Sequence, residues 1–254
     1  MKMSETMNAR KKIIINADDC GMSQLVNEHI EKAILAGKIS STTVMANMDD
    51  LSGAASLYQK YKDEISFGWH LNLSEGKPLM QSQILLDRGF IVETDLGIQF
   101  NGRKFKNKFL DKRTTDEIKK EMLAQYESLR DSGIAPTHID GHHHIHTSIW
   151  ALPILPSFLK DLGIDKMRRM YNNNAGIRNM IIREGWATYY KIRGMVMPDV
   201  LCNYIEFANK DIKIQGDVIE LECHPGHPNF THEEDLLMTL QLSDKYELVT
   251  YRQI

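Results

Sequence analysis

Short apolar runs rich in β-branched residues alternate with segments of helical periodicity along this chain of 254 residues. Such alternation is typical of βαβ units, in which helices join parallel strands and cover the sheet. We predict eight strands, a number that favours a parallel α/β barrel. The predicted strands cover residues 12–17, 42–47, 65–71, 137–140, 166–170, 194–197, 218–223 and 247–251.

Local signals predict several of the helices between these strands. A helix is expected over residues 23–35, closed by Gly37, because glycine readily adopts the left-handed conformation that ends a helix. T-x-x-E capping boxes at residues 114–117 and 231–234 predict the starts of two more helices. Between residues 77 and 112 the periodicity is lost and turn residues dominate. We predict that this inserted segment is a lid or a binding element.

Length and composition favour one domain. A chain of 254 residues with 42% hydrophobic residues can bury a full core, so residues 1–254 are expected to form a single α/β domain. The net charge of -3 includes no polybasic block, which argues against nucleic acid as a partner.

Targeting signals are missing from the sequence. No stretch approaches the ~20 apolar residues that span a bilayer. Residues 1–12 are polar and lack the apolar region of a signal peptide. The cysteines, Cys20, Cys202 and Cys223, form no CxxC pair and suit reduced thiols. We therefore expect a soluble, cytoplasmic protein that does not bind membranes.

Ionisable residues follow four of the predicted strands. Asp18 and Asp19 follow the first, His70 lies near the end of the third, residues 138–146 hold five histidines and one aspartate, and His224 follows the seventh. Sites in parallel α/β barrels form at the carboxyl ends of the strands, so these groups are expected to converge. Aspartate and neutral imidazole are common ligands of zinc and other transition metals. The sequence thus predicts a metal site.

Each group also has a structural interpretation. The adjacent Asp18 and Asp19 can be a turn that caps a helix; alternatively, at a bend, one carboxylate can ligate a metal while the other takes a proton. His70 can be a core histidine bonded to backbone, although Gly68 leaves room for the close approach of a ligand or of backbone. His224 precedes a Pro-Gly turn and can be a loop residue or a proton donor.

The histidine run is too long for every member to bind one ion. Alternate residues from 138 to 146 would share one face if the strand continued, spread over roughly 13 Å, whereas Zn–N bonds are ~2.0 to 2.1 Å long. One or two can therefore be ligands. The rest, including His138, Asp140 and His144, are expected to orient ligands or to bind substrate. The alternative is a surface tract with fortuitous metal affinity.

Four motifs share one ordered pattern along the chain. They are NADDCG at residues 16–21, GWHLNL at 68–73, THIDGHHHIH at 137–146 and CHPG at 223–226. In order and spacing they resemble the YdjC-like family of carbohydrate deacetylases over nearly the whole chain, with a weaker match between residues 77 and 112. The resemblance implies an irregular (β/α) barrel of the glycoside hydrolase/deacetylase type, removal of acetyl groups from N-acetylated sugars such as chitooligosaccharides, and a homodimer.

The resemblance also implies roles for individual residues. Asp19, His70 and His142 would bind a divalent metal. Asp18 would be the general base, and His224 would be the proton donor. This ligand set suits Mg²⁺ or Zn²⁺, and also Mn²⁺, Co²⁺ or Fe²⁺.

Two positions depart from the family pattern. Cys20 stands where the family usually has phenylalanine, and Gly141 often corresponds to serine. Neither change removes an implied ligand, so both bear on the shape of the pocket and the choice of substrate.

Two other functions fit the same residues. In a metal-dependent sugar isomerase or lyase, Asp18 would abstract a proton beside a metal-bound carbonyl. In a non-catalytic sugar-binding barrel the metal would be structural, but such a protein would need neither a spare base nor an acid. Release of acetate distinguishes the deacetylase from both alternatives.

Overall fold

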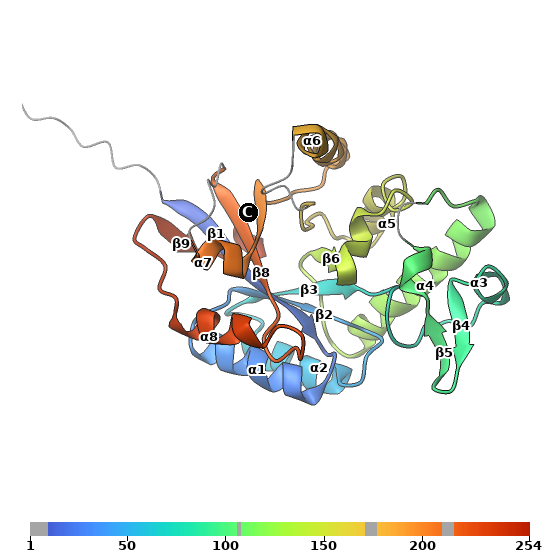
Figure 1. The fold of residues 1–254 in the computed structure, drawn as a ribbon, viewed down its shortest axis with the longest axis horizontal. Helices are drawn as coiled ribbons and strands as arrows, with labels where there is room; N and C mark the ends of the chain where they lie inside the picture. Colours follow the sequence, from blue (N-terminus) through green and yellow to red (C-terminus); the bar gives the residue numbers. More distant parts are fainter. Residues whose placement is uncertain (1–9, 106–107, 171–176, 210–215) are drawn as a thin grey trace, which may run out of the picture.

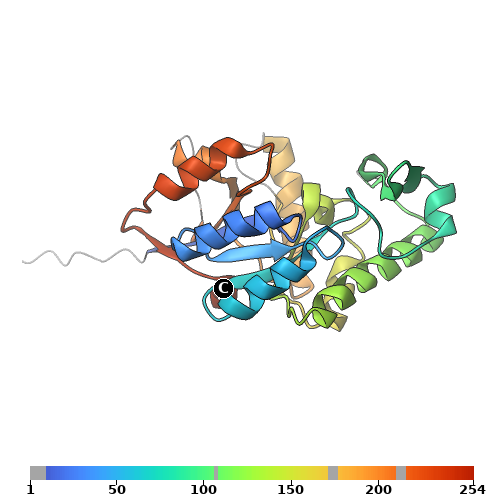
Figure 2. The same cartoon turned by 90° about the horizontal axis from the view of Figure 1, so that it is seen from below.

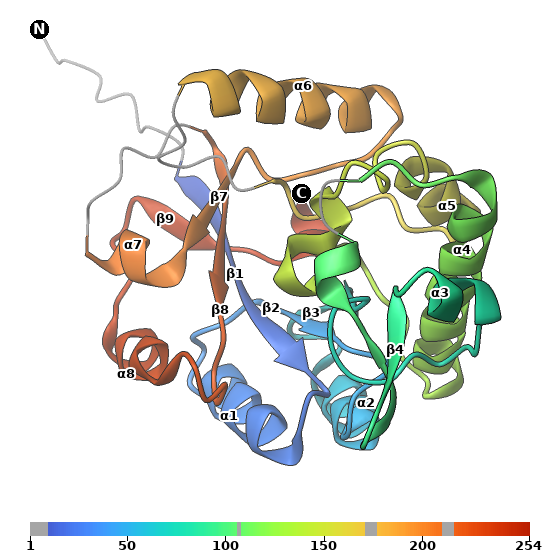
Figure 3. The same cartoon turned by 45° about the vertical axis from the view of Figure 1, so that its right-hand side comes forward.

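The structure is a computed structural model that describes residues 10–105, 108–170, 177–209 and 216–254. A curled sheet of parallel strands runs through the centre, and helices lie around its outside (Figures 1 and 3). The strand order is β6-β3-β2-β1-β8-β7, and β9 pairs with β1. These strands are β1 (Lys11–Cys20), β2 (Ser41–Val44), β3 (Ser66–Leu71), β6 (Ile139–Gly141), β7 (Val200–Asn203), β8 (Val218–Cys223) and β9 (Tyr246–Leu248).

The central strand is β1, which is buried from residue 13 to residue 20. It pairs in parallel with β2 on one side and with β8 on the other. Strands buried on both faces are apolar over most of their length, and the isoleucine run at residues 13–15 meets that requirement. The first part of β1 also pairs with β9, where Lys11 lies opposite Tyr246.

Helices cover the sheet in an arrangement typical of α/β barrels. Helices α1, α2 and α8 lie on the same side of the sheet (Figures 1 and 2). The helices are α1 (Gln24–Leu35), α2 (Leu51–Tyr61), α3 (Gln83–Asp87), α4 (Lys112–Asp131), α5 (Leu155–Asp161), α6 (Ile177–Ile192), α7 (Tyr204–Ala208) and α8 (Thr231–Thr239). Short 3₁₀ helices are η1 (Gly102–Lys104), η2 (His142–Thr147) and η3 (Tyr251–Gln253).

The barrel is irregular where two predicted strands should lie. Residues 166–170 and 194–197 contribute only isolated bridges, which pair Ile139 with Met167 and Lys166 with Val196. The strand that pairs with β8 is instead β7, which the sequence analysis did not predict. Of the predicted run 247–251, only the beginning is a strand, and Tyr251 already belongs to η3. The predicted class, an irregular α/β barrel, is nevertheless confirmed.

The predicted starts of α1 and α8 agree with the structure, whereas α4 starts earlier than predicted and neither predicted capping box forms. Ser23 caps α1, and Gly37 follows its end with a φ of +64°, as predicted. Helix α4 begins earlier than expected, because Asp111 accepts from the backbone N–H groups of Arg113 and Thr114 and so replaces the predicted capping box. Helix α8 begins at Thr231, but no side chain caps it.

The inserted segment forms a small substructure of its own. Strands β4 (Ile91–Thr94) and β5 (Gly97–Phe100) form an antiparallel hairpin. The hairpin and α3 lie beyond α4, at the end of the molecule opposite β9 and α7 (Figure 1). Trp150 donates its indole N–H to the Phe105 carbonyl at 2.9 Å, which ties the segment to the loop after η2. Residues 106 and 107 of the segment lie outside the described residues.

None of the helices in the described parts of the chain is both long and apolar enough to cross a membrane.

Candidate metal centre and active site

A distortion in β1 brings both of its aspartates to the same site. The register of β1 against β2 shifts between Ala17 and Cys20, and Asp19 has a φ of +66°. In a regular strand successive side chains point to opposite faces, so the two carboxylates would diverge. A left-handed conformation is unfavourable for a non-glycine residue by roughly 1 to 2 kcal/mol. The surrounding structure therefore has to hold Asp19 in place.

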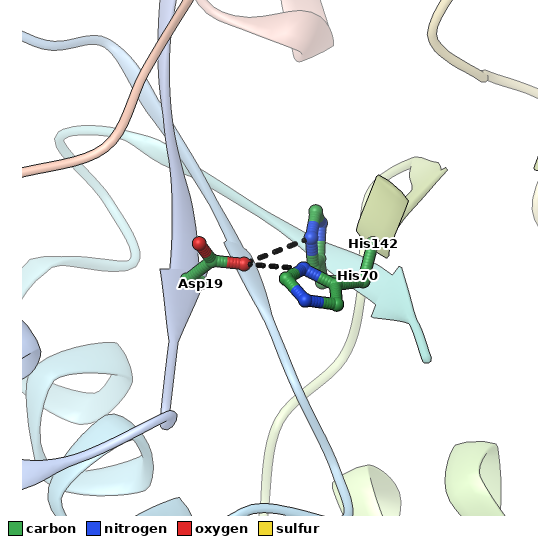
Figure 4. Close-up of side chains that lie close together, drawn as sticks. All are labelled: Asp19, His70 and His142. Atoms are coloured by element: carbon green, nitrogen blue, oxygen red, sulfur yellow. Dashed lines mark ion pairs between the residues drawn. The ribbon is translucent and has the colours of Figure 1, made fainter. Parts of the chain in front are cut away.

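Three side chains converge on this point (Figure 4). Asp19 from β1 lies opposite His70 from β3 and His142 from the start of η2. Asp19 Oδ1 is 3.1 Å from His70 Nε2 and 2.9 Å from His142 Nδ1. All three residues are buried. The structure thus brings together the residues that the family resemblance implied as metal ligands.

The three side chains fit a divalent metal ion. Oxygen and nitrogen ligands held ~2.0 to 2.2 Å from one tetrahedral ion lie about 3.3 Å apart, close to the observed separations. Among the described residues, no N–H group makes a hydrogen bond of normal geometry to the buried Asp19 Oδ1. A buried carboxylate oxygen without a donor is costly. A cation between the three ligands would satisfy it.

Two other groups of ligand atoms suit a cation less well. Asp18, His70 and Asp140 also lie close together, but the guanidinium of Arg168 already supplies positive charge to both carboxylates. The remaining group combines His142 with Glu75 and His143, both of which are exposed. The Asp19, His70 and His142 group, which we call the triad, is therefore the best candidate metal site among the described residues.

Carboxylates orient both imidazoles of the triad. His70 Nδ1 lies 2.7 Å from Asp140 Oδ1, and Thr43 donates its hydroxyl to the other oxygen of Asp140 at 3.0 Å. His142 Nε2 lies 2.9 Å from Glu75, which follows β3. A carboxylate that accepts the outer ring N–H fixes the tautomer and makes the other nitrogen a better ligand. His70 and His142 thus present Nε2 and Nδ1, respectively, to Asp19.

Loss of Glu75 is expected to weaken metal binding. Because Glu75 orients His142, Glu75→Ala should lower metal affinity by about 10- to 100-fold, the range for outer hydrogen-bond partners of metal ligands. Competition with a chelator measures the affinity. Glu93→Ala, which removes an exposed carboxylate from the hairpin, is the matched control. Equal affinities of the two variants would mean that Glu75 does not orient His142.

The second aspartate, Asp18, is held by an arginine. Arg168 places one N–H group on each oxygen of Asp18 at 2.6 Å, and Asn16 donates to Oδ1 at 2.8 Å. Of the two oxygens, Oδ2 receives a single donor within the described part of the chain, and it lies 3.9 Å from His224 Nε2. A carboxylate oxygen has about two lone-pair sites, so Oδ2 keeps one for another partner.

Arg168 is fully buried and uses all five of its N–H groups. Besides Asp18, it contacts Asp140 at 3.0 Å, Glu220 at 2.7 Å and Glu222 at 3.4 Å. Burial raises the pKa of Asp18, but the charge and hydrogen bonds of Arg168 outweigh that effect and hold the pKa well below its usual range. Asp18 is therefore ionised throughout the neutral pH range.

His224 lies across the site from Arg168 and is held by Glu233. Glu233 is buried, and one of its oxygens accepts from the His224 backbone N–H at 2.7 Å and lies 3.1 Å from Nδ1. The ring stacks on Phe230, with centroids 4.2 Å apart. Burial lowers the pKa of His224, but the hydrogen bond to Glu233 and the charge of Asp18 outweigh it and raise the pKa to about 9. His224 therefore carries a proton at neutral pH.

The other predicted site residues lie in different surroundings. Asp140 contacts His70 Nδ1, as an orienting group would, and its role stays a prediction. His138 is buried, and its ring stacks on Tyr251 with centroids 3.6 Å apart. Gly68 leaves room for that ring, because a Cβ atom on residue 68 would lie 2.5 Å from it.

The histidine run leaves the strand after Gly141. His143 and His144 have φ values of +51° and +55°, so residues 142–146 do not continue the alternation of a strand. His144 is exposed, and its Nε2 lies 3.8 Å from Glu222 at the edge of the site. The expectation that alternate members share one face therefore does not apply beyond residue 141.

A cavity of about 560 Å³ adjoins the triad. The ring of His143, which lines it, is centred 4.0 Å from the ring of His142. The inserted segment supplies most of the wall, and its role as a lid or binding element stays a prediction. The lining residues are Ser74, Val92, Phe100, Asn101, Gly102, Arg103 and His143.

Three residues of the site were missed by the sequence analysis. Arg168 lies within the predicted strand 166–170, and its position near a strand end was the available signal. Glu75 follows β3 by a few residues. Glu233 lies next to Glu234, which was assigned to the predicted capping box. Glu75 and Arg168 contact predicted site residues that are 67 and 150 residues away in the sequence, whereas Glu233 contacts His224, which lies nine residues before it.

Comparison with known proteins identifies relatives along most of the chain. A carbohydrate deacetylase of Clostridium beijerinckii is 28% identical over 216 residues, which are 85% of this chain and 82% of that protein. A chitooligosaccharide deacetylase of Yersinia enterocolitica is 27% identical over 256 residues, with 95% and 96% of the two chains covered.

A solved structure shares the fold. The crystal structure of a protein described as a "putative cellobiose-phosphate cleavage protein" from Enterococcus faecalis has a TM-score of 0.72 and 21% identity, and the match covers 96% of this chain and 99% of that chain. The profile of the family described as "YdjC-like protein" matches residues 12–252. Because that match spans nearly the whole sequence, the chain belongs to the YdjC-like protein family.

Proposed function

We propose that this protein is a metal-dependent hydrolase that removes acetyl groups from N-acetylated sugars of the chitooligosaccharide type. The observation that carries the proposal is the placement of an ionised carboxylate, Asp18, and a protonated imidazole, His224, within 3.9 Å of each other, with Asp18 next to Asp19 of the triad. The names of the relatives support the substrate class, since they include a carbohydrate deacetylase and a chitooligosaccharide deacetylase.

The triad would hold a divalent cation, for which we propose Mg²⁺ or Zn²⁺. When bound, such a cation polarises a carbonyl oxygen and lowers the pKa of a water molecule. Elemental analysis of the purified protein tests the identity of the cation, and light scattering on a sizing column tests the predicted homodimer.

Asp18 would take the proton of the attacking water. Its Oδ2 has a free lone-pair site toward His224, and Arg168 and Asn16 hold the carboxylate in a single orientation. The low pKa makes Asp18 a weak base, which suffices only if the water is itself acidified. Asp18 therefore depends, as the base, on the cation that the triad would hold. Neither Asp18 nor the cation alone would support hydrolysis.

His224 would protonate the departing nitrogen. An amine can leave at neutral pH only if the nitrogen gains a proton, because an amide anion is a very poor leaving group. Glu233 binds His224 at Nδ1, so Nε2 is the nitrogen that faces Asp18. The raised pKa keeps the proton available at neutral pH.

The cavity beside His143 would bind the sugar. Phe100 and Val92 offer apolar surface to a sugar ring, while Ser74, Asn101 and Arg103 offer polar groups to its hydroxyls. We propose that the inserted segment binds the substrate in this way and so contributes to the choice of sugar.

Acetate release from N,N'-diacetylchitobiose tests the proposal directly. Metal-loaded protein should release acetate, and EDTA-treated protein should not. Conversion of a sugar without acetate release would favour an isomerase or lyase, and binding without any conversion would favour a non-catalytic sugar-binding barrel.

The rate should fall as the pH rises through the pKa of His224. Because the pKa is raised to about 9, His224 is competent as an acid below that pH and loses its proton above it. A bound cation adds positive charge nearby, so the fall should begin at or below about pH 9. The profile of kcat/KM against pH measures it. In Glu233→Gln the fall should move to lower pH, and an unmoved profile would exclude His224 as the acid.

A further inference from the structure

Arg168 is anchored on the side away from Asp18 by a second buried carboxylate. Glu220 in β8 is fully buried, and its Oε1 accepts from Arg168 Nε at 2.7 Å. The two terminal nitrogens of the same guanidinium bind Asp18. Because the guanidinium is planar and rigid, its orientation at Nε determines where those two nitrogens lie.

Glu220 is in turn held by Tyr251. The Tyr251 hydroxyl donates to Glu220 Oε2 at 2.6 Å, so each oxygen of Glu220 has its own donor. The terminal torsion of a glutamate has no sharply preferred angle, so two donors at opposite oxygens are what define the plane of the carboxylate.

Tyr251 itself has little freedom to move. It is fully buried in η3, where a capping box between Thr250 and Gln253 closes the turn. Its ring stacks on His138 with an angle of 10° between the planes. A continuous chain of contacts between buried side chains thus runs from Tyr251 through Glu220 and Arg168 to Asp18.

We propose that Tyr251 is a positioning residue whose hydroxyl, through Glu220 and Arg168, sets the orientation of the Asp18 carboxylate. The inference rests on the proposed function, in which Asp18 takes a proton from water. It assigns a role in turnover to a residue that makes no hydrogen bond to a triad residue within the described part of the chain.

Tyr251→Phe tests the hydroxyl alone, because phenylalanine lacks that group but keeps the ring that stacks on His138. With N,N'-diacetylchitobiose as substrate, kcat should fall about 10-fold or more, since small displacements of catalytic groups cost up to about 100-fold. KM and metal affinity should stay within about twofold of wild type. A purely structural role would lower the melting temperature and leave the kcat of the folded protein unchanged, which would overturn the inference.

Tyr190→Phe is the matched control. Tyr190 is also buried, but its hydroxyl has no hydrogen-bond partner in the described part of the chain. Removal of that hydroxyl should leave kcat unchanged. An equal loss of kcat in both variants would show that Tyr251 has no specific role.

A double variant tests whether Tyr251 acts through Asp18. If it does, adding Tyr251→Phe to Asp18→Asn should cause no further loss of kcat, because both changes disable the same group. Additive losses would overturn the inference. Should Tyr251→Phe fail to fold, Glu220→Gln keeps the shape of the same link, and an unchanged kcat in that variant would likewise overturn it.

The outcomes separate the inference from the function on which it rests. Wild-type protein that releases no acetate would overturn the proposed function and the inference together. Acetate release by wild type with an unchanged kcat in Tyr251→Phe would overturn the inference alone.

Discussion

Replacement of Asp18 by asparagine is expected to lower kcat for acetate release by about 10²- to 10⁴-fold, the usual contribution of a general base. The amide keeps the shape of the side chain but cannot accept a proton from water. Metal affinity should be almost unchanged, because the three triad side chains remain in place. Steady-state rates at saturating metal, together with a chelator competition, measure the two quantities.

The same change has a cost in stability that the experiment must take into account. Both oxygens of Asp18 accept hydrogen bonds from Arg168. In the asparagine variant the side-chain NH₂ group would therefore face an N–H group of Arg168, and both would lack an acceptor. A buried polar group that loses its partner costs about 1 to 3 kcal/mol. Rates should therefore be measured well below the melting temperature of the variant. Asp131→Asn, an exposed change at the end of α4, controls for the chemistry of the substitution. Full activity in Asp18→Asn would remove Asp18 from the mechanism.

Truncation of either triad histidine is expected to abolish both metal binding and turnover. His70→Ala or His142→Ala removes a ligand itself, so the loss of affinity should exceed the roughly 10- to 100-fold cost of losing an outer partner. Isothermal titration with Zn²⁺ or Mg²⁺ measures the affinity, and acetate release measures turnover.

The control for the triad variants is His232→Ala, which removes an exposed histidine from α8. That variant should bind metal as wild type does. A His142→Ala variant that keeps one tightly bound metal per chain would mean that the cation lies elsewhere, with the exposed Glu75 and His143 pair still available. A His70→Ala variant that keeps one tightly bound metal per chain would lead to the same conclusion.

The sequence predicted the site better than it predicted the strands that surround it. Asp19 and His70 lie at the ends of long apolar runs, and such runs form strands wherever the core surrounds them. The convergence of strand ends then follows from the parallel sheet. The bulge at Asp19 could not be predicted, because it depends on the contacts of β1 with β2 and on the groups that hold a left-handed aspartate.

Arg168 illustrates what periodicity cannot reveal. It lies in a run that looks like a strand, yet the run makes only isolated bridges with its neighbours. Its function comes from carboxylates on β1, β6 and β8, as many as 150 residues away. Local patterns do not indicate which charged residue will be buried among distant partners, so Arg168 was missed while Asp18, which it holds, was found.

The position of β1 has a consequence for the order in which the molecule can assemble. The strand that carries Asp18 and Asp19 leaves the ribosome well before residues 218–223 and 246–248, with which it pairs. Contacts between residues so far apart in sequence form slowly, because a long loop must close first. During synthesis, the apolar isoleucines of β1 therefore lack their partners and are open to aggregation. Yield should consequently improve when chaperones are present during synthesis.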